Sequence, residues 1–115
     1  MSDRAAVLFA NDAFYVAFLS HDIQAMEALW ASGPTISCVH PGWNHLAGRD
    51  VVIESWDGIL ANQEGPEFEV KGSTASVFED TAVVICYEVF AEWTMVATNV
   101  FVREDGEWRI MHHQA

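Results

Sequence analysis

The stretch TAVVICYEVFAEWTMVATNVFVREDGEWRIMHHQ, residues 81–114, decides the fold. Its apolar residues come in runs of strand length, interrupted near Glu92-Trp93 and at Asp105-Gly106. Asp-Gly between two such runs is a strong signal for a two-residue hairpin turn. The stretch therefore predicts three consecutive antiparallel strands. A further strand from Phe68 precedes them and joins them at a turn at Glu79-Asp80.

Two-residue turns also fix the register, and therefore the face of the sheet on which each side chain lies. A turn at Asp105-Gly106 places Asn99 opposite His112, and a turn at Glu92-Trp93 puts Glu88 on the same face. Besides apolar residues, this face is predicted to hold Glu88, Asn99, His112 and Gln114. The opposite face is predicted to hold Ile85, Tyr87, Val89, Val96, Thr98, Val100, Val102, Met111 and His113.

Both faces of this predicted sheet are largely apolar. A sheet with one face in water shows alternating apolar and polar residues, and these strands do not. Three short helices can cover only one face, so the other face needs a cover that the chain does not supply. A second copy of the chain is the simplest cover, and the sequence predicts a homodimer packed through the outer sheet face.

The residues before these strands predict three helices. Ser2 can cap a first helix with an apolar stripe at helical spacing, and Asp22 can cap a second, shorter one. Residues 35–40 alternate like a short strand, and a third helix begins near Gly48–Asp50. Helices followed by an antiparallel meander predict an α+β fold with the helices on one face of the sheet.

The 115 residues make one domain, expected over residues 1–115, with a formal net charge of −12. Such a charge repels phosphate backbones and anionic lipids, so we expect no nucleic-acid or membrane partner. The longest apolar run, Ala82–Tyr87, is too short to span a bilayer, and the N-terminus lacks the pattern of a signal peptide. Cys38 and Cys86 are expected to be free buried thiols, and the chain cytoplasmic.

The predicted inner face gathers the candidate catalytic residues. A buried carboxylate needs a partner, and His112 is the natural one for Glu88. One interpretation is a general acid/base pair at the floor of a pocket, with Asn99 and Gln114 orienting the ligand. The other is a hydrogen-bonded polar cluster that only fixes the strand register.

His40 closes the first predicted strand and is expected at the mouth of the same pocket. Trp43 and Trp56 are candidates to line it, and Tyr15 and Asn11 on the first helix to donate hydrogen bonds into it. The alternative is that the tryptophans and Tyr15 are core residues. The predicted ligand is a small apolar or mixed-polarity molecule.

No cofactor or metal is expected. His112 and His113 are adjacent on a strand and point to opposite faces, so they cannot share an ion within one sheet layer. No glycine-rich phosphate loop and no nucleophile elbow are present.

Several strings, in order along nearly the whole chain, resemble the SnoaL-like branch of the nuclear transport factor 2-like superfamily. They are NDAFY at 11–15, DIQAMEALW at 22–30, CVHPGW at 38–43, GRDVV at 48–52, ATNVF at 97–101, DGEW at 105–108 and HH at 112–113. The resemblance implies a cystatin-like conical α+β barrel with a deep apolar pocket, usually homodimeric. Relatives include ketosteroid isomerases, polyketide cyclases, limonene epoxide hydrolases, dehydratases and the association domain of the calmodulin-dependent kinase.

The resemblance also implies roles for individual residues. In the isomerases and cyclases, an aspartate before a proline at the end of the first strand is the catalytic acid or base; His40, before Pro41, stands at the matching position. Tyr15 resembles in placement the oxyanion donor of the isomerases, and Asn99 falls near their second donor. The implied function is a cofactor-independent isomerase, cyclase, dehydratase or epoxide hydrolase. The alternative is a noncatalytic ligand-binding or association module.

Overall fold

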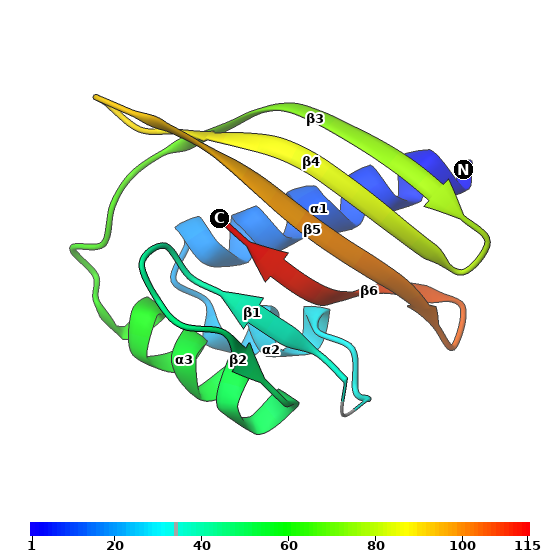
Figure 1. Ribbon diagram of the computed structural model, residues 1–115, viewed down its shortest axis with the longest axis horizontal. Helices are drawn as coiled ribbons and strands as arrows, with labels where there is room; N and C mark the ends of the chain where they lie inside the picture. The colour runs from blue at the N-terminus through cyan, green and yellow to red at the C-terminus, as the bar shows by residue number, and fades with distance from the viewer. Residues whose placement is uncertain (34) are drawn as a thin grey trace.

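The computed structural model describes residues 1–33 and 35–115, in which three helices pack on one face of a six-stranded sheet (Figure 1). The strands lie in the order β2-β1-β6-β5-β4-β3. Along the chain the elements are α1 (Asp3–Leu19), α2 (Ile23–Leu29), β1 (Ser37–Val39), β2 (Leu46–Ala47), α3 (Arg49–Ala61), β3 (Glu69–Phe78), β4 (Thr81–Val89), β5 (Thr94–Glu104) and β6 (Glu107–Gln114).

The first two helices begin at the predicted caps. Ser2 Oγ accepts a hydrogen bond from the Ala5 backbone N–H at 3.1 Å, and Asp22 Oδ1 accepts one from the Ala25 N–H at 3.0 Å. Each bond satisfies a donor that the first helical turn leaves free. None of the described helices is long and apolar enough to cross a membrane.

The α+β class and the helices on one face are confirmed, but the sheet differs from the prediction in two respects. It is mixed, because β1 pairs in parallel with β6, Ser37 lying opposite His112. It is also open, since β2 and β3 form its two edges and do not pair with each other. The chain therefore forms a strongly curved sheet rather than a closed barrel (Figure 1).

The connection between β4 and β5 is longer than predicted. Val89 pairs with Thr94, and the four residues between them form a loop in which the Phe90 N–H donates to the Trp93 carbonyl at 2.8 Å. The register is thereby shifted by two residues. Because side chains alternate with a period of two, every side chain of these strands keeps its predicted face.

The β5–β6 hairpin begins as predicted and then changes register. Asp105 and Gly106, both with positive φ, form the turn, and Phe101 lies opposite Ile110 as predicted. A β-bulge follows, so that Asn99 lies opposite His113, not His112. The bulge adds one extra residue to β6, and every side chain of β6 after it therefore points to the opposite face of the sheet. The prediction of His112 on the inner face and His113 on the outer face is therefore wrong.

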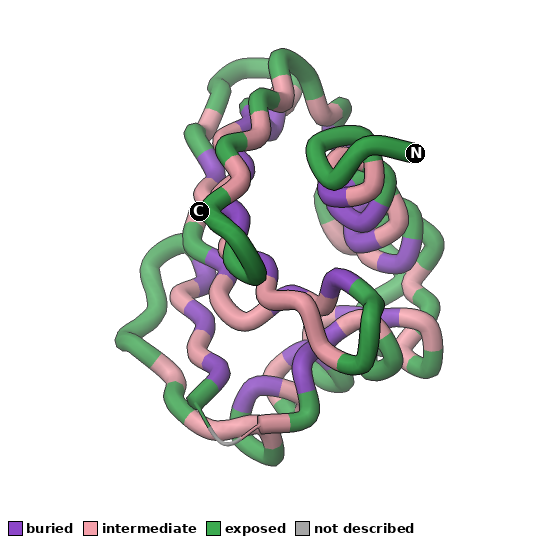
Figure 2. The backbone as a smooth tube through the Cα atoms, turned by 90° about the vertical axis from the view of Figure 1, so that its right-hand side faces the viewer, coloured by how far each residue is buried: buried purple, intermediate pink, exposed green. Residues whose placement is uncertain are grey.

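The core lies between the helices and the inner face, and buried residues alternate with less buried ones along the strands (Figure 2). Both cysteines, Cys38 and Cys86, are free and buried, as predicted. No described helix covers the outer face, on which the Tyr87 and Val96 side chains are 43% and 56% exposed. The predicted apolar outer face is therefore present.

Candidate functional site

A buried polar cluster joins α1 to the inner face of the sheet. Tyr15 donates its hydroxyl proton to Glu88 Oε2 at 2.7 Å, across 73 residues of sequence. The Asn99 amide NH2 donates to Asn11 Oδ1 at 2.8 Å and to Tyr15 Oη at 3.3 Å. Asn99 Oδ1 lies 2.6 Å from His113 Nδ1. The hydrogen bonds thus form a chain from His113 through Asn99 and Tyr15 to Glu88.

This chain fixes the protonation of His113. The amide oxygen of Asn99 can only accept, so the proton of the His113 ring lies on Nδ1 and the Nε2 lone pair is free. Burial lowers the pKa of His113 to about 3, with smaller contributions from the nearby His40 and His112. His113 is therefore neutral at physiological pH.

His40 lies at the end of β1 and is held by α3. Its Nε2 is 2.9 Å from Ser55 Oγ, and the Ser55 hydroxyl donates to the Val52 carbonyl at 2.6 Å. The Ser55 proton is thus in use, so His40 donates from Nε2 and keeps a lone pair on Nδ1. Burial lowers the pKa of His40 to about 4. The rings of Trp43 and Trp56 contact it edge to face, both with centroids at 4.8 Å.

Burial shifts the pKa of Glu88 upward, in the opposite direction to its effect on the two histidines. Its side chain is 2% exposed, and burial raises its pKa, although the hydrogen bond from Tyr15 opposes the shift. Burial also raises the pKa of the Tyr15 hydroxyl, and the nearby Glu88 adds to this. Tyr15 is thus a fixed hydrogen-bond donor and not a base.

Glu88, His40 and His113 meet at one hollow, which we call the central cavity. It has a volume of about 270 Å³ and opens between α1, α3 and the wide end of the sheet. Its other lining residues are mostly apolar: Phe18, Pro41, Trp43, Ile59, Pro66, Phe68, Phe90, Trp93 and Met95. A few convergent polar groups in an apolar wall are typical of a small-molecule site.

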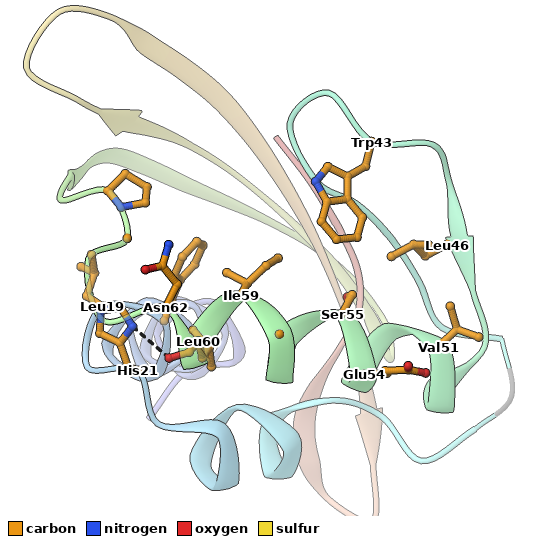
Figure 3. Close-up of a pocket in the computed structure, with 14 residues that line it drawn as sticks. Leu19, His21, Trp43, Leu46, Val51, Glu54, Ser55, Ile59, Leu60 and Asn62 are labelled. Atoms are coloured by element: carbon orange, nitrogen blue, oxygen red, sulfur yellow. Dashed lines mark hydrogen bonds between the residues drawn. The ribbon is translucent and has the colours of Figure 1, made fainter.

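A second hollow, the outer pocket, adjoins the central cavity (Figure 3). It has a volume of about 630 Å³ and lies over α3, with Trp43 and Leu46 facing Ser55 and Ile59 across it (Figure 3). The central cavity and the outer pocket share the walls Phe18, Trp43, Ile59 and Pro66. A ligand larger than the central cavity can therefore extend into the outer pocket.

The structure brings most of the predicted site residues together. His40, Glu88 and Trp43 line the central cavity. Tyr15 and Asn99 lie in the hydrogen-bonded layer behind Glu88. They contact Glu88 and His113 and do not line the central cavity themselves.

Three predicted residues are placed elsewhere. Trp56 is fully buried against the rings of His40 and His113 and does not line the central cavity. His112 lies on the outer face, where its Nδ1 is 2.7 Å from Ser37 Oγ, and Gln114 lies beside it. The expected pairing of His112 with Glu88 is therefore wrong, because the bulge in β6 gives the inner position to His113.

The sequence prediction missed several lining residues. His113 was assigned to the other face, and nothing in the local sequence marks the bulge that reverses it. Phe68, Phe90 and Trp93 flank strand ends, where an aromatic residue is as common at a mouth as in a core. Asn11, which was predicted to donate a hydrogen bond into the pocket, is fully buried behind it, and its Oδ1 accepts a hydrogen bond from Asn99.

Within the described residues, no group of three or more histidine, cysteine, aspartate or glutamate side chains is placed to hold a metal ion. The groups that can act on a ligand are a carboxyl group with raised pKa and two neutral imidazoles with lowered pKa. Their chemistry is proton transfer and hydrogen bonding.

Comparison with known proteins agrees with this architecture. A structure from Streptomyces avermitilis, described as a proposed dehydratase of the nuclear transport factor 2-like family, is 36% identical and covers 97% of this chain and 93% of its own, with a TM-score of 0.84. A proposed calcium/calmodulin-dependent protein kinase type II association domain from Thiobacillus denitrificans is 28% identical, covering 91% of this chain and 89% of its own, with a TM-score of 0.77.

Sequence and fold neighbours extend the comparison. The F-box protein SKIP8 of Arabidopsis thaliana is 27% identical over 112 residues, 96% of this chain, and the chain spans about half (48%) of that relative. Structures of cystatin-like fold from Nostoc punctiforme (12% identical) and Caulobacter vibrioides (18%) each cover 96% of this chain, with a TM-score of 0.77, and confirm the predicted fold class. The SnoaL-like domain matches residues 7–115. The chain thus belongs to the SnoaL-like domain family, among the nuclear transport factor 2-like proteins.

Proposed function

We propose that the central cavity binds a small organic molecule and that Glu88 transfers protons to and from it. One observation carries this proposal: the Glu88 carboxyl group is 2% exposed, yet it forms part of the wall of an otherwise apolar cavity. Tyr15 occupies Oε2, and the described residues donate no hydrogen bond to Oε1. Oε1 is therefore the atom left for a ligand.

The surroundings suit proton transfer near neutral pH. Burial raises the pKa of Glu88 and lowers the pKa of His40 to about 4. These shifts place the pKa of Glu88 above that of His40, so Glu88 holds a proton more tightly than His40 does. A proton can then pass between the ligand and these groups without creating a strongly unfavourable charge.

Loss of water from a β-hydroxy carbonyl compound is the first reaction to test, because the 36% identical Streptomyces protein is described as a proposed dehydratase. Glu88 Oε1 removes the proton from the carbon next to the carbonyl, and the electron pair of that C–H bond forms the C=C bond. The hydroxyl group leaves with its bonding electrons and takes the proton from Glu88 to form water. Glu88 is thereby regenerated.

Glu88→Gln tests the role of Glu88 in this reaction. Glutamine keeps the volume and an acceptor for Tyr15 but cannot take up a proton. Hits from a thermal-shift screen of β-hydroxy carbonyl, steroid-like and terpenoid compounds would be assayed for loss of water by mass spectrometry. We expect turnover to fall about 100-fold or more while the ligand still stabilises the variant.

His112→Asn is the control for this experiment, because His112 lies on the outer face. It should keep turnover within about twofold, whereas His113→Asn should lower it. Full turnover in Glu88→Gln would contradict the proposal.

We also propose that two copies of the chain associate through the outer sheet face. Such a dimer fits an association module, and it is equally compatible with an enzyme. The outer face is apolar, and no described element covers it. The 28% identical Thiobacillus protein is named as an association domain. Light scattering at micromolar concentration should give the mass of two chains, and the mass of one chain would contradict this proposal.

A cytoplasmic location is likewise proposed. It is supported by Cys38 and Cys86, which are free and buried and therefore suit a reducing compartment. Fractionation of cells that express the full-length protein would test it, and recovery of the protein outside the cytoplasm would overturn it.

A further inference from the structure

We infer that the ligand of the central cavity is an organic cation, an amine or quaternary ammonium compound with an apolar body about the size of one aromatic ring. This inference rests on the proposed function and names the substrate class for the same cavity. It is carried by the carboxyl group of Glu88, which has no lysine or arginine as a partner, by the aromatic walls and by the absence of lysine and arginine from the described lining.

The carboxyl group of Glu88 has no basic side chain as its partner. The chain has five lysine and arginine residues in all. Four make hydrogen bonds or salt bridges elsewhere: Arg49 binds backbone carbonyls at the end of α2, Lys71 pairs with Glu69, Arg103 pairs with Asp3 and Asp80, and Arg109 pairs with Glu107. Arg4 is exposed on the first turn of α1.

A buried carboxylate without a counter-charge is costly, and proteins normally pair it. In this chain burial shifts the pKa of Glu88 upward, since no neighbouring cation opposes the shift. A positively charged ligand supplies the missing charge at Oε1. A neutral ligand leaves the cost in place, and an anion adds to it.

The walls of the central cavity are suited to the same charge. Five aromatic rings line it: Phe18, Trp43, Phe68, Phe90 and Trp93. Phe90 stacks on Trp93 with centroids 5.1 Å apart, and Phe68 lies 5.0 Å from Phe90. The Trp43 and Trp93 side chains are 48% and 57% exposed and so stand at the mouth. The faces of aromatic rings attract ammonium groups, and several together form a cage for quaternary ammonium ligands.

Among the described residues, the lysine, arginine, aspartate and glutamate side chains that line the hollows beside the central cavity are all acidic. The outer pocket contributes Glu54, and a neighbouring hollow that shares Phe68 and Phe90 with the central cavity contributes Glu67 and Glu69. Glu69 is paired with Lys71 at 3.4 Å, whereas no salt bridge of Glu54 or Glu67 occurs among the described residues. Neither lysine nor arginine lines these three hollows in the described part of the chain.

The volume sets the size of the ligand. An apolar cavity of about 150 Å³ holds a benzene ring. The central cavity, at about 270 Å³, therefore has room for one ring with a short amine-bearing arm. Longer compounds would extend into the outer pocket past Trp43 and Ile59.

Three probes of matched size and different charge test the inference: benzylamine, benzyl alcohol and benzoate, titrated calorimetrically at pH 8. We expect the protonated amine to bind at least tenfold more tightly than the alcohol, and benzoate not to bind. Glu88→Gln should lower the affinity for benzylamine at least tenfold and change that for benzyl alcohol less than twofold. Glu27→Gln removes one negative charge from the exposed side of α2 and should leave both affinities unchanged.

The outcomes separate this inference from the proposed function. Equal or tighter binding of the alcohol or the anion would overturn the cationic ligand and leave the cavity as a binding site. No binding of any probe would count against both. If circular dichroism shows that Glu88→Gln is unfolded, Phe90→Leu takes its place. This variant removes an aromatic face at constant charge, and it should lower the affinity for benzylamine more than the affinity for benzyl alcohol.

Benzyltrimethylammonium adds a pH readout, because its own charge does not titrate. Its affinity should rise with pH until Glu88 is fully ionised and then level off, since only the carboxylate attracts it. The titratable groups that face Glu88 are Tyr15, Cys86, His40 and His113. A pH-independent affinity in the wild type would contradict the role of Glu88. The pH dependence should be absent in Glu88→Gln.

Discussion

Asn99 shows how much one side chain determines in this molecule. Its amide group donates to two residues of α1 and accepts from His113, so three of its hydrogen-bonding positions are used inside the core. A chain of buried hydrogen bonds of this kind is rigid, because each member fixes the donor or acceptor role of the next. Asn99 therefore fixes the proton of the neutral His113 ring on Nδ1 and keeps Tyr15 directed at Glu88.

The pKa of His113 gives a prediction about stability. It is about 3 in the folded chain and about 6.5 when unfolded, so below pH 6.5 the unfolded chain binds a proton that the folded chain does not. The free energy of unfolding should therefore fall as the pH decreases from 7 to 5, by about 2 kcal/mol from this residue alone. In His113→Asn this contribution is absent, while the amide N–H can still donate to Asn99.

Urea denaturation at several pH values measures the difference in the free energy of unfolding between the wild type and His113→Asn. The wild type should lose stability relative to His113→Asn as the pH is lowered, whereas His112→Asn should follow the wild type. The side chains packed around His113 include Asn99, Phe14, Trp56 and His40, and all four are unchanged in both variants. Parallel curves for the wild type and His113→Asn would show that His113 is not buried in its neutral form.

Single residues were predictable from the sequence where the local pattern carried the signal. The inner-face positions of Glu88 on β4 and Asn99 on β5 follow from the alternation of side chains along each strand. A register shift of two residues does not change this alternation. His113 does not, because a bulge depends on how two strands twist against the rest of the fold and not on the residues of the hairpin turn. The sequence thus predicted that Glu88, Asn99 and a histidine share the inner face, with the wrong one of two adjacent histidines.

Among the elements, α2 is the one that needs support from outside itself. It has only seven residues, too few for a helix that is stable alone. Arg49, the first residue of α3, donates to the carbonyls of Glu27, Trp30 and Ala31 at 2.9–3.0 Å. Its guanidinium group satisfies carbonyls that the end of a helix leaves free and ties α2 to α3.

Arg49→Ala should therefore destabilise the domain by about 1–3 kcal/mol, because hydrogen bonds from a charged group are lost and partly buried carbonyls lose their donor. Arg49→Lys should recover only part of this, since an ammonium group cannot match the planar fork that reaches three carbonyls. Arg4→Ala, an exposed change of the same type on α1, is the control and should cost less than about 0.5 kcal/mol. Equal stability of Arg49→Ala and the wild type would contradict the assigned role.

The elements that the sequence predicted are those with local signals: helix caps, hairpin turns and long apolar runs. The two-residue strand β2 and the parallel pairing of β1 with β6 were missed. β1 and β6 are separated by most of the chain, and only the assembled helices bring them together. No local property of residues 37–39 distinguishes a parallel from an antiparallel partner.

At the scale of the whole molecule, the proposed dimer through the outer sheet face gives a prediction about assembly. Val96→Glu would place a charge in the centre of the proposed interface, where Val96 is 56% exposed in the single chain. We expect the dissociation constant of the dimer to rise at least about 100-fold, because a buried unpaired charge costs several kcal/mol. Sedimentation or light scattering over a concentration series measures this.

Val16→Glu is the matched control, since Val16 is 67% exposed on α1, away from the sheet. It should leave the dimer intact. Because each copy carries a net charge of −12, added salt should strengthen association by screening the repulsion between copies. A dimer that withstands Val96→Glu would place the interface elsewhere.

The hydrogen-bonded cluster also has a consequence for biosynthesis. Asn11 and Asn99 bond across 88 residues, and His113 lies two positions before the last residue of the sequence. A ribosome extends the chain from its N-terminus, so α1 emerges long before the strands against which Asn11 and Tyr15 must pack. While the domain is being translated, α1 therefore exposes its apolar face, and Asn11 and Tyr15 are still in contact with water. The central cavity is complete only after β6, which carries His113, has left the exit tunnel.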